Sequence, residues 1–218
     1  MSTVAIFIAL VAGIVLWILL VRRLTARSWE SRSDTGDFGA IGAPPARIAL
    51  WMFLAVVTSV FGLFFSAYTM RMHHGDWHHI SEPDVLWVNT VVLILASVAL
   101  EYSRRAARKQ DMQGLKIGLV LGGALTLAFL AGQLVAWQQI RASGQFMTSS
   151  PAIAFFYVLT AVHGLHLLGG LTVWGKTVGR LAGGAELIDV RLSVELCAVY
   201  WHYLLLVWGV LFALLLAT

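Results

Sequence analysis

Ionisable side chains inside long apolar stretches are the residues of this sequence with the clearest potential for chemistry. His163 and His166 lie three residues apart in one such stretch, and Glu195 and His202 lie seven residues apart in the next. Either spacing places its two side chains on one face of a helix. Such imidazole and carboxylate groups can bind a metal or haem, relay protons, hold a lipid headgroup or join two helices.

Three interpretations of these groups remain open. Ligation of haem or a metal calls for widely spaced histidines on facing helices, and a proton relay calls for carboxylates spread across a bilayer. The apolar stretches offer only three histidines and very few carboxylates. A structural or lipid-holding role is therefore favoured. Because a short loop joins the two stretches, we expect antiparallel helices joined by hydrogen bonds, with Glu195 toward the half that holds His166 and His202 nearer His163.

A second group of histidines lies in a polar segment. His73, His74, His78 and His79 flank Asp76, and together they could bind zinc or copper. A dedicated metal site holds its ligands on rigid elements, whereas this segment reads as a short loop. We therefore favour a polar loop at a membrane surface over a metal site.

Other catalytic constellations are missing from the sequence. Cys197 is the single cysteine, so the chain cannot form a disulfide framework or a thiolate metal cluster by itself. No nucleophile triad, phosphate-binding loop or dinucleotide-binding turn is visible. We expect no catalytic residue and no cofactor-binding residue in this chain.

The elements that must position these groups are membrane-spanning helices. Of the 218 residues, 59% are hydrophobic and 12% are charged, and the mean hydropathy is +0.82. A soluble domain carries about 25% charged residues. Six apolar stretches are long enough to span a bilayer, namely 4–21, 48–70, 85–102, 115–140, 152–174 and 192–217. We predict an all-α polytopic transmembrane bundle with six spans. The first is expected to be a retained helix, because Arg22 and Arg23 follow it and no positive charge precedes it.

The distribution of Lys and Arg predicts the orientation. Arg71 and Arg141 alone lie in the even-numbered loops, and the rest of the 15 basic residues lie in the odd-numbered ones. The odd loops should therefore face the cytoplasm, and both termini should face the periplasm of a bacterial inner membrane. Basic residues dispersed in this way form no nucleic-acid-reading motif, so we expect no nucleic-acid partner.

Glycines repeat every fourth residue at the start of the fourth predicted span, at Gly114, Gly118 and Gly122. A strip of this kind lets a second helix approach closely. We favour packing within the chain over a dimer interface.

Two longer motifs carry a resemblance to a known family. An aromatic pair, Phe155-Phe156, is followed by Thr160 and then by the run His163-Gly164-Leu165-His166 in 155–166, and Glu195 precedes Tyr200-Trp201-His202-Tyr203. In this order they resemble the subunit III family of haem–copper respiratory oxidases. Asn89-Thr90 and Gly132-Gln133 are similar to that family as well. The resemblance covers 47–217, so residues 1–46 are expected to form an additional helix and a cytoplasmic linker, and 47–218 a five-helix bundle.

The resemblance implies a non-catalytic subunit of a cytochrome c oxidase, a proton-translocating oxidoreductase of aerobic respiration. It implies that haem and copper reside in partner subunits, with this chain docked on the catalytic subunit I and near subunit II. It also implies bound phospholipid. From the matching motifs, a lipid-binding or helix-packing role is carried over to His163, His166, Glu195, Trp201 and His202.

The sequence departs from the family pattern at two places. Segment 57–60 lacks the glutamate that the family often has in this helix, and 204–206 is all leucine where the family often has an aspartate. These departures argue against proton handling. They leave a second assignment as an alternative, a related subunit of a quinol oxidase or a nitric oxide reductase. A stand-alone transporter or membrane cytochrome is the alternative from another class, although no clear internal repeat points to a transporter.

Overall fold

Five long helices make up the part of the chain that the computed structural model describes, residues 45–72, 84–144 and 150–216. They are α2 (Pro45–Arg71), α3 (Val85–Arg108), α4 (Met112–Ala142), α5 (Pro151–Ala182) and α6 (Leu187–Leu216). All five are long and apolar enough to cross a membrane, and no strand occurs in these ranges. The predicted all-α membrane bundle is confirmed for its last five spans. The predicted span 4–21 lies outside the described residues.

Local sequence explains where the helices begin and turn. Pro151 occupies the first turn of α5, where its missing N–H costs nothing, and the Ser150 side chain accepts a hydrogen bond from the backbone of Ala152. Asp111 caps α4 in the same way, accepting from the Gly114 N–H at 3.0 Å. Between α3 and α4, Gln110 has a φ of 60°, so the chain reverses within three residues. This tight turn makes α3 and α4 antiparallel neighbours.

The glycine strip brings α4 against α3. A Cβ added to Gly118 would lie 2.7 Å from the Ser103 backbone nitrogen and 2.8 Å from the Ala99 carbonyl oxygen. A Cβ added to Gly122 would lie 2.6 Å from Leu100. Only glycine permits this approach, so packing within the chain, predicted from the four-residue spacing, is confirmed.

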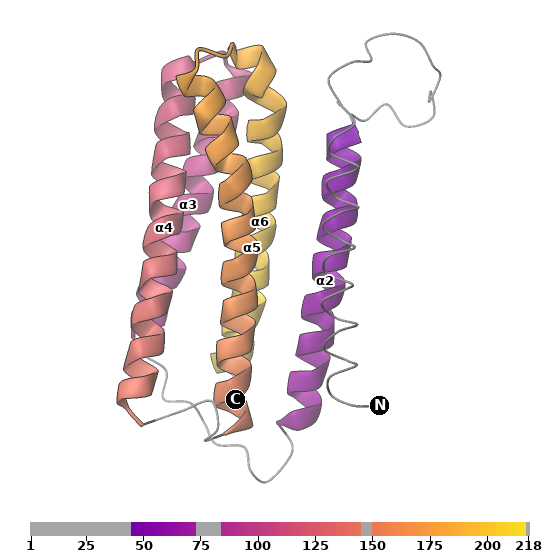
Figure 1. The fold of residues 1–218 in the computed structure, drawn as a ribbon, viewed down its shortest axis with the longest axis vertical. Coiled ribbons are helices and arrows are strands. Elements are labelled where there is room, and N and C mark those ends of the chain that lie inside the picture. The colour runs from indigo at the N-terminus through magenta and orange to yellow at the C-terminus, as the bar shows by residue number, and fades with distance from the viewer. Residues whose placement is uncertain (1–44, 73–83, 145–149, 217–218) are drawn as a thin grey trace, which may run out of the picture. The chain divides into compact units, whose positions relative to one another are not determined.

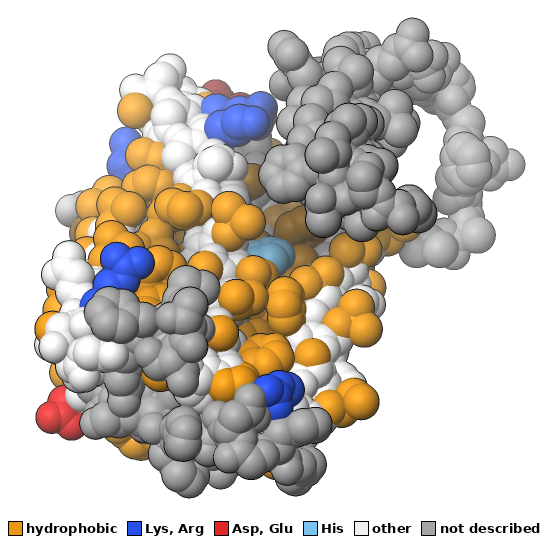
Figure 2. Space-filling view, turned by 60° about the horizontal axis from the view of Figure 1, so that its bottom comes forward, with side chains coloured by type: hydrophobic (Ala, Val, Ile, Leu, Met, Phe, Trp, Pro, Cys, Tyr) orange, Lys and Arg blue, Asp and Glu red, His pale blue; other side chains and the backbone are white. Residues whose placement is uncertain are grey.

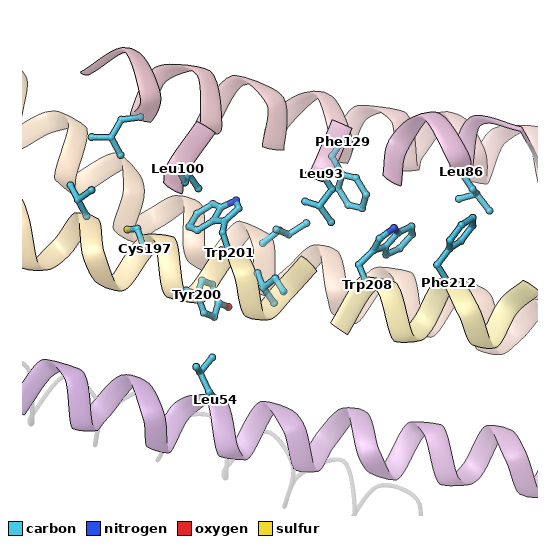
Figure 3. Packing of buried hydrophobic residues seen from close by; sticks show 14 of the residues in the cluster. Leu54, Leu86, Leu93, Leu100, Phe129, Cys197, Tyr200, Trp201, Trp208 and Phe212 are labelled. Atoms are coloured by element: carbon cyan, nitrogen blue, oxygen red, sulfur yellow. The ribbon is translucent and has the colours of Figure 1, made fainter. Parts of the chain in front are cut away.

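Helix α6 is the central element of the bundle. It lies beside α3 and α5 (Figure 1), and it also contacts α2. Figure 3 shows Trp201, Trp208 and Phe212 of α6 pointing toward α3 and α4, while Tyr200 faces Leu54 of α2. Both tryptophans are almost completely buried. The core of the bundle is therefore built from large aromatic side chains of α6.

The outer surface of the bundle is apolar, as lipid contact requires. Figure 2 shows a face on which hydrophobic side chains predominate, with Lys and Arg side chains scattered among them. Helix α2 is the least buried of the five, and only Leu54, Val57, Phe61 and Tyr68 are buried among its residues. Trp51, Met52 and Leu63 of the same helix are well exposed. In water such a surface would cause aggregation, whereas in a bilayer it is solvated.

Candidate functional site

His163 lies in the middle of the bundle, sandwiched by aromatic rings. Its side chain is 0% exposed. The ring centroid lies 5.9 Å from that of Phe129 on α4 and 5.3 Å from that of Trp208 on α6. Neither ring nitrogen has a hydrogen-bond partner within the described residues. His163 therefore packs three helices together through ring contacts rather than through polar ones.

The other two histidines of the predicted site face away from each other. Nδ1 of His166 lies 2.7 Å from the Val162 carbonyl oxygen, and its ring lies 5.4 Å from that of Phe61 on α2. Nδ1 of His202 lies 2.6 Å from the Ala198 carbonyl oxygen. Each imidazole thus bonds to the backbone one turn earlier in its own helix.

The predicted hydrogen-bonded contact among His163, His166, Glu195 and His202 was therefore wrong. Helix α5 has neighbours on several sides, and side chains three residues apart differ by about 60° in direction, enough to face different helices. One hydrogen bond that does join α5 to α6 comes from Tyr200, whose hydroxyl donates to the His166 carbonyl oxygen at 2.9 Å. This role of Tyr200 was not predicted from the sequence, because its acceptor is a backbone carbonyl oxygen and every residue type carries one.

Tryptophan–threonine hydrogen bonds link the helices elsewhere in the bundle. Trp201 Nε1 donates to Thr126 Oγ1 of α4 at 2.9 Å, and Trp208 Nε1 donates to Thr90 Oγ1 of α3 at 3.0 Å. A third pair, Trp137 with Thr160, joins α4 to α5. Each pair satisfies an indole N–H that lipid could not satisfy. The packing role predicted for Trp201 has a physical basis here, and the threonine partners were not anticipated.

Glu195 lies at one end of the bundle among arginines from three helices. Its carboxylate lies 3.3 Å from Arg47 of α2, 3.3 Å from Arg108 of α3 and 3.9 Å from Arg191 of its own helix. The Glu195 side chain is only 16% exposed. We call this the arginine-rich end of the bundle. The carboxylate ties α2, α3 and α6 together rather than α5 and α6.

A large cavity opens between α2, α5 and α6. Its volume is about 740 Å³, within the range of sites that hold small molecules. Representative lining residues are Leu50, Phe53, His166, Gly170, Cys197 and Tyr200. Most of this lining is apolar, and its polar groups are the His166 ring, the hydroxyls of Thr172 and Tyr200 and the Cys197 thiol. A cavity with this lining suits a hydrocarbon chain better than a polar substrate.

Metal ligation has no support in the described ranges. Within 45–72, 84–144 and 150–216, no three His, Cys, Asp or Glu side chains come close enough to hold an ion. The loop candidates His73, His74, His78 and His79 lie outside the described residues.

A bundle of apolar helices that tryptophan–threonine hydrogen bonds and the ion pairs of Glu195 hold together is typical of a multi-pass membrane protein. The model of the family described as cytochrome c oxidase subunit III matches residues 47–217, which include α3 to α6 and all of α2 except its first two residues. This chain belongs to the cytochrome c oxidase subunit III family.

Similar curated proteins carry consistent names. The cytochrome c oxidase subunit 3 of Thermostichus vulcanus is 29% identical, over 88% of this chain and 92% of the relative. That of Synechocystis sp. is 30% identical over 81% of this chain and 77% of the relative. That of Corynebacterium diphtheriae is 27% identical over 73% of this chain and 79% of the relative.

Proposed function

We propose that this chain is a non-catalytic subunit III of a haem–copper terminal oxidase, and that it stabilises the catalytic subunit of that complex. The main support for the proposal is that polar side chains inside the bundle join one helix to another. Trp201 and Tyr200 join helices by hydrogen bonds, and Glu195 joins them by ion pairs. Groups committed to packing in this way favour a rigid supporting bundle over a redox or transport centre.

The complex would hold its haem and copper in partner subunits, with subunit I as the catalytic partner and subunit II beside it. It would couple cytochrome c oxidation to oxygen reduction and to proton translocation. In this arrangement the arginine-rich end faces the cytoplasm and the C-terminus faces the periplasm of a bacterial inner membrane. The basic side chains at Arg47, Arg108 and Arg191 support that orientation.

The cavity between α2, α5 and α6 supports a lipid-binding role. Its apolar wall would receive an acyl chain, and Ala46 at its edge adjoins Arg47 of the arginine-rich end. A phospholipid phosphate could bind these arginines while its chain enters the cavity. His166 and Trp201 would then contact lipid as part of the lining, whereas His163 would act in packing alone.

Purification under mild conditions tests the proposal. The full chain is tagged in its own host, extracted in mild detergent and analysed by mass spectrometry and by optical spectroscopy. We expect larger oxidase subunits and a haem spectrum in the complex. The chain produced without these partners should show no haem absorption. Recovery of the chain without any oxidase subunit, or a stoichiometric haem in the isolated chain, would contradict the proposal.

A quinol oxidase or nitric oxide reductase is the second candidate complex. Val57 and Leu204 are buried at the two segments where the family often carries carboxylates, so neither segment offers a proton-handling group. The missing carboxylates favour the assignment of this chain to a divergent branch of the family. Oxygen uptake by the purified complex with reduced cytochrome c, compared with quinol, distinguishes the two oxidases, and nitric oxide consumption identifies the reductase.

A further inference from the structure

Three polar side chains that line the cavity between α2, α5 and α6 donate their hydrogens to the protein backbone. Nδ1 of His166 lies 2.7 Å from the Val162 carbonyl oxygen, which can only accept, so the proton of the imidazole is on Nδ1. The Tyr200 hydroxyl donates to the His166 carbonyl oxygen at 2.9 Å. The Thr172 hydroxyl donates to the Gly169 carbonyl oxygen at 2.7 Å. None of the three side chains therefore has a hydrogen left for a ligand.

The other groups around the deep part of the cavity are weak donors or are already bonded. Trp201 points away from α2 (Figure 3), and its indole N–H donates to Thr126 of α4 at 2.9 Å. The Cys197 thiol is at most a weak donor. Backbone N–H groups inside α5 and α6 are bonded within their own helices. Around His166 and Tyr200, the described residues thus offer a ligand acceptors rather than donors.

Nε2 of His166 is the acceptor that most needs a partner. With the proton on Nδ1, the neutral imidazole keeps a lone pair on Nε2, and no described residue bonds to that nitrogen. Tyr200, which bonds to the backbone of His166, lies five residues beyond Glu195, or about 8 Å further along α6 from the arginine-rich end. At that depth the surroundings are hydrocarbon, which has no donor to offer, so an unpaired acceptor is costly.

We propose that the cavity binds a lipid-soluble quinol, a flat ring that carries hydroxyl groups and an apolar tail. A hydroxyl of the quinol donates to Nε2 of His166. The ring contacts the aromatic side chains of the lining, where the ring centroid of Phe53 lies 6.4 Å from that of His166 and 6.0 Å from that of Tyr200. The apolar wall of the cavity, whose volume is about 740 Å³, receives the tail.

The acceptors select the reduced form of this ligand. An oxidised quinone carries carbonyl oxygens in place of the hydroxyls, and a carbonyl oxygen cannot donate to Nε2 of His166. A phospholipid chain fills the same apolar wall, but its ester groups carry no donor either. The two lipids therefore compete for the cavity, and the quinol alone pairs the buried acceptor. The inference goes beyond the proposed function and holds for any complex that contains this chain.

A matched pair of ligands tests the proposal. The full chain is placed in phospholipid nanodiscs under nitrogen, and a tritiated alkyl benzoquinol or the corresponding benzoquinone is titrated. Specific binding is the difference from Gly169→Trp, in which the indole fills the cavity. We expect one quinol per chain, bound roughly tenfold more tightly than the quinone, as one hydrogen bond implies. Equal affinities, or no binding beyond that of Gly169→Trp, would overturn the proposal. Either result would leave the proposed function standing, because co-purification tests that separately.

Two histidine substitutions provide a second readout. His166→Phe removes the acceptor and keeps a ring beside Phe61, whereas His202→Phe makes the same change outside the cavity lining. We expect His166→Phe to weaken quinol binding roughly tenfold and to leave quinone binding unchanged. His202→Phe should alter neither, and helical circular dichroism checks that both variants fold. Unchanged quinol binding in His166→Phe, or an equal loss for both ligands, would contradict a hydrogen bond to Nε2. If His166→Phe did not fold, the comparison of quinol with quinone on the unmodified chain would still decide.

Discussion

At His163, the shape of the ring matters more than its polarity. The imidazole contacts Phe129 and Trp208, and its nitrogens make no hydrogen bond with any described residue. A buried polar atom without a partner costs stability, so the favourable contribution of this residue must come from packing. Glu195 is the opposite case, because its role depends on charge: three arginines surround one carboxylate.

The packing role of His163 predicts different effects for two substitutions. His163→Phe keeps a ring of similar size and removes the unpaired nitrogens, so the unfolding temperature of the chain in detergent should stay equal or rise. His163→Ala leaves a cavity between three helices and should lower the free energy of unfolding by about 3–5 kcal/mol. Helical circular dichroism during heating measures both. If His163→Phe were as damaging as His163→Ala, the imidazole nitrogens would have to bind something essential.

At the scale of the elements, the contact between α3 and α4 depends on glycine. Gly118 lies against the α3 backbone, whereas a Cβ added to Gly175 of α5 would meet no atom within 4 Å. A methyl group can be accommodated at one of these positions and not at the other.

The two glycines therefore form a matched pair for substitution. Gly118→Ala forces the helices apart and should destabilise the bundle by about 1–3 kcal/mol, because backbone atoms cannot move aside cheaply. Gly175→Ala should be neutral or should stabilise α5 by up to about 1 kcal/mol through helix propensity. Thermal unfolding in detergent measures both variants. Equal effects of the two substitutions would show that close approach at Gly118 is unimportant.

At the scale of the whole molecule, the bundle is not closely packed throughout, because a cavity opens between α2, α5 and α6. Gly169 lines this cavity, and a Cβ added there would meet no atom within 4 Å. A large side chain at this position could fill the space without displacing the helices. Gly209 of α6 is equally unobstructed and is absent from the cavity lining.

Gly169→Trp should therefore reduce the phospholipid that purifies with the chain, by about one molecule per chain. Gly209→Trp serves as the control, and it should leave the lipid content unchanged. Native mass spectrometry, or phosphorus analysis of the purified protein, measures the difference. An unchanged lipid content in Gly169→Trp would show that the cavity does not hold lipid.

Features that depend on near neighbours in the chain were predictable from the sequence. Five spans follow from apolar runs of sufficient length, because the bilayer imposes the same requirement on every helix. Close packing of α4 within the chain follows from the spacing of Gly114, Gly118 and Gly122, although the structure was needed to show that its neighbour is α3. The family resemblance follows from motifs within α5 and α6, and each motif is continuous in the sequence.

Tertiary structure alone decided which way each polar side chain faces. Glu195 meets Arg47 of α2 and Arg108 of α3, and His202 lies 4.0 Å from Glu101 on α3. No spacing rule connects these positions, because the rotation of a helix about its axis is set by packing against all its neighbours at once. The sequence by itself therefore determined the helices and the family, while the packed bundle determined which helices the polar groups join.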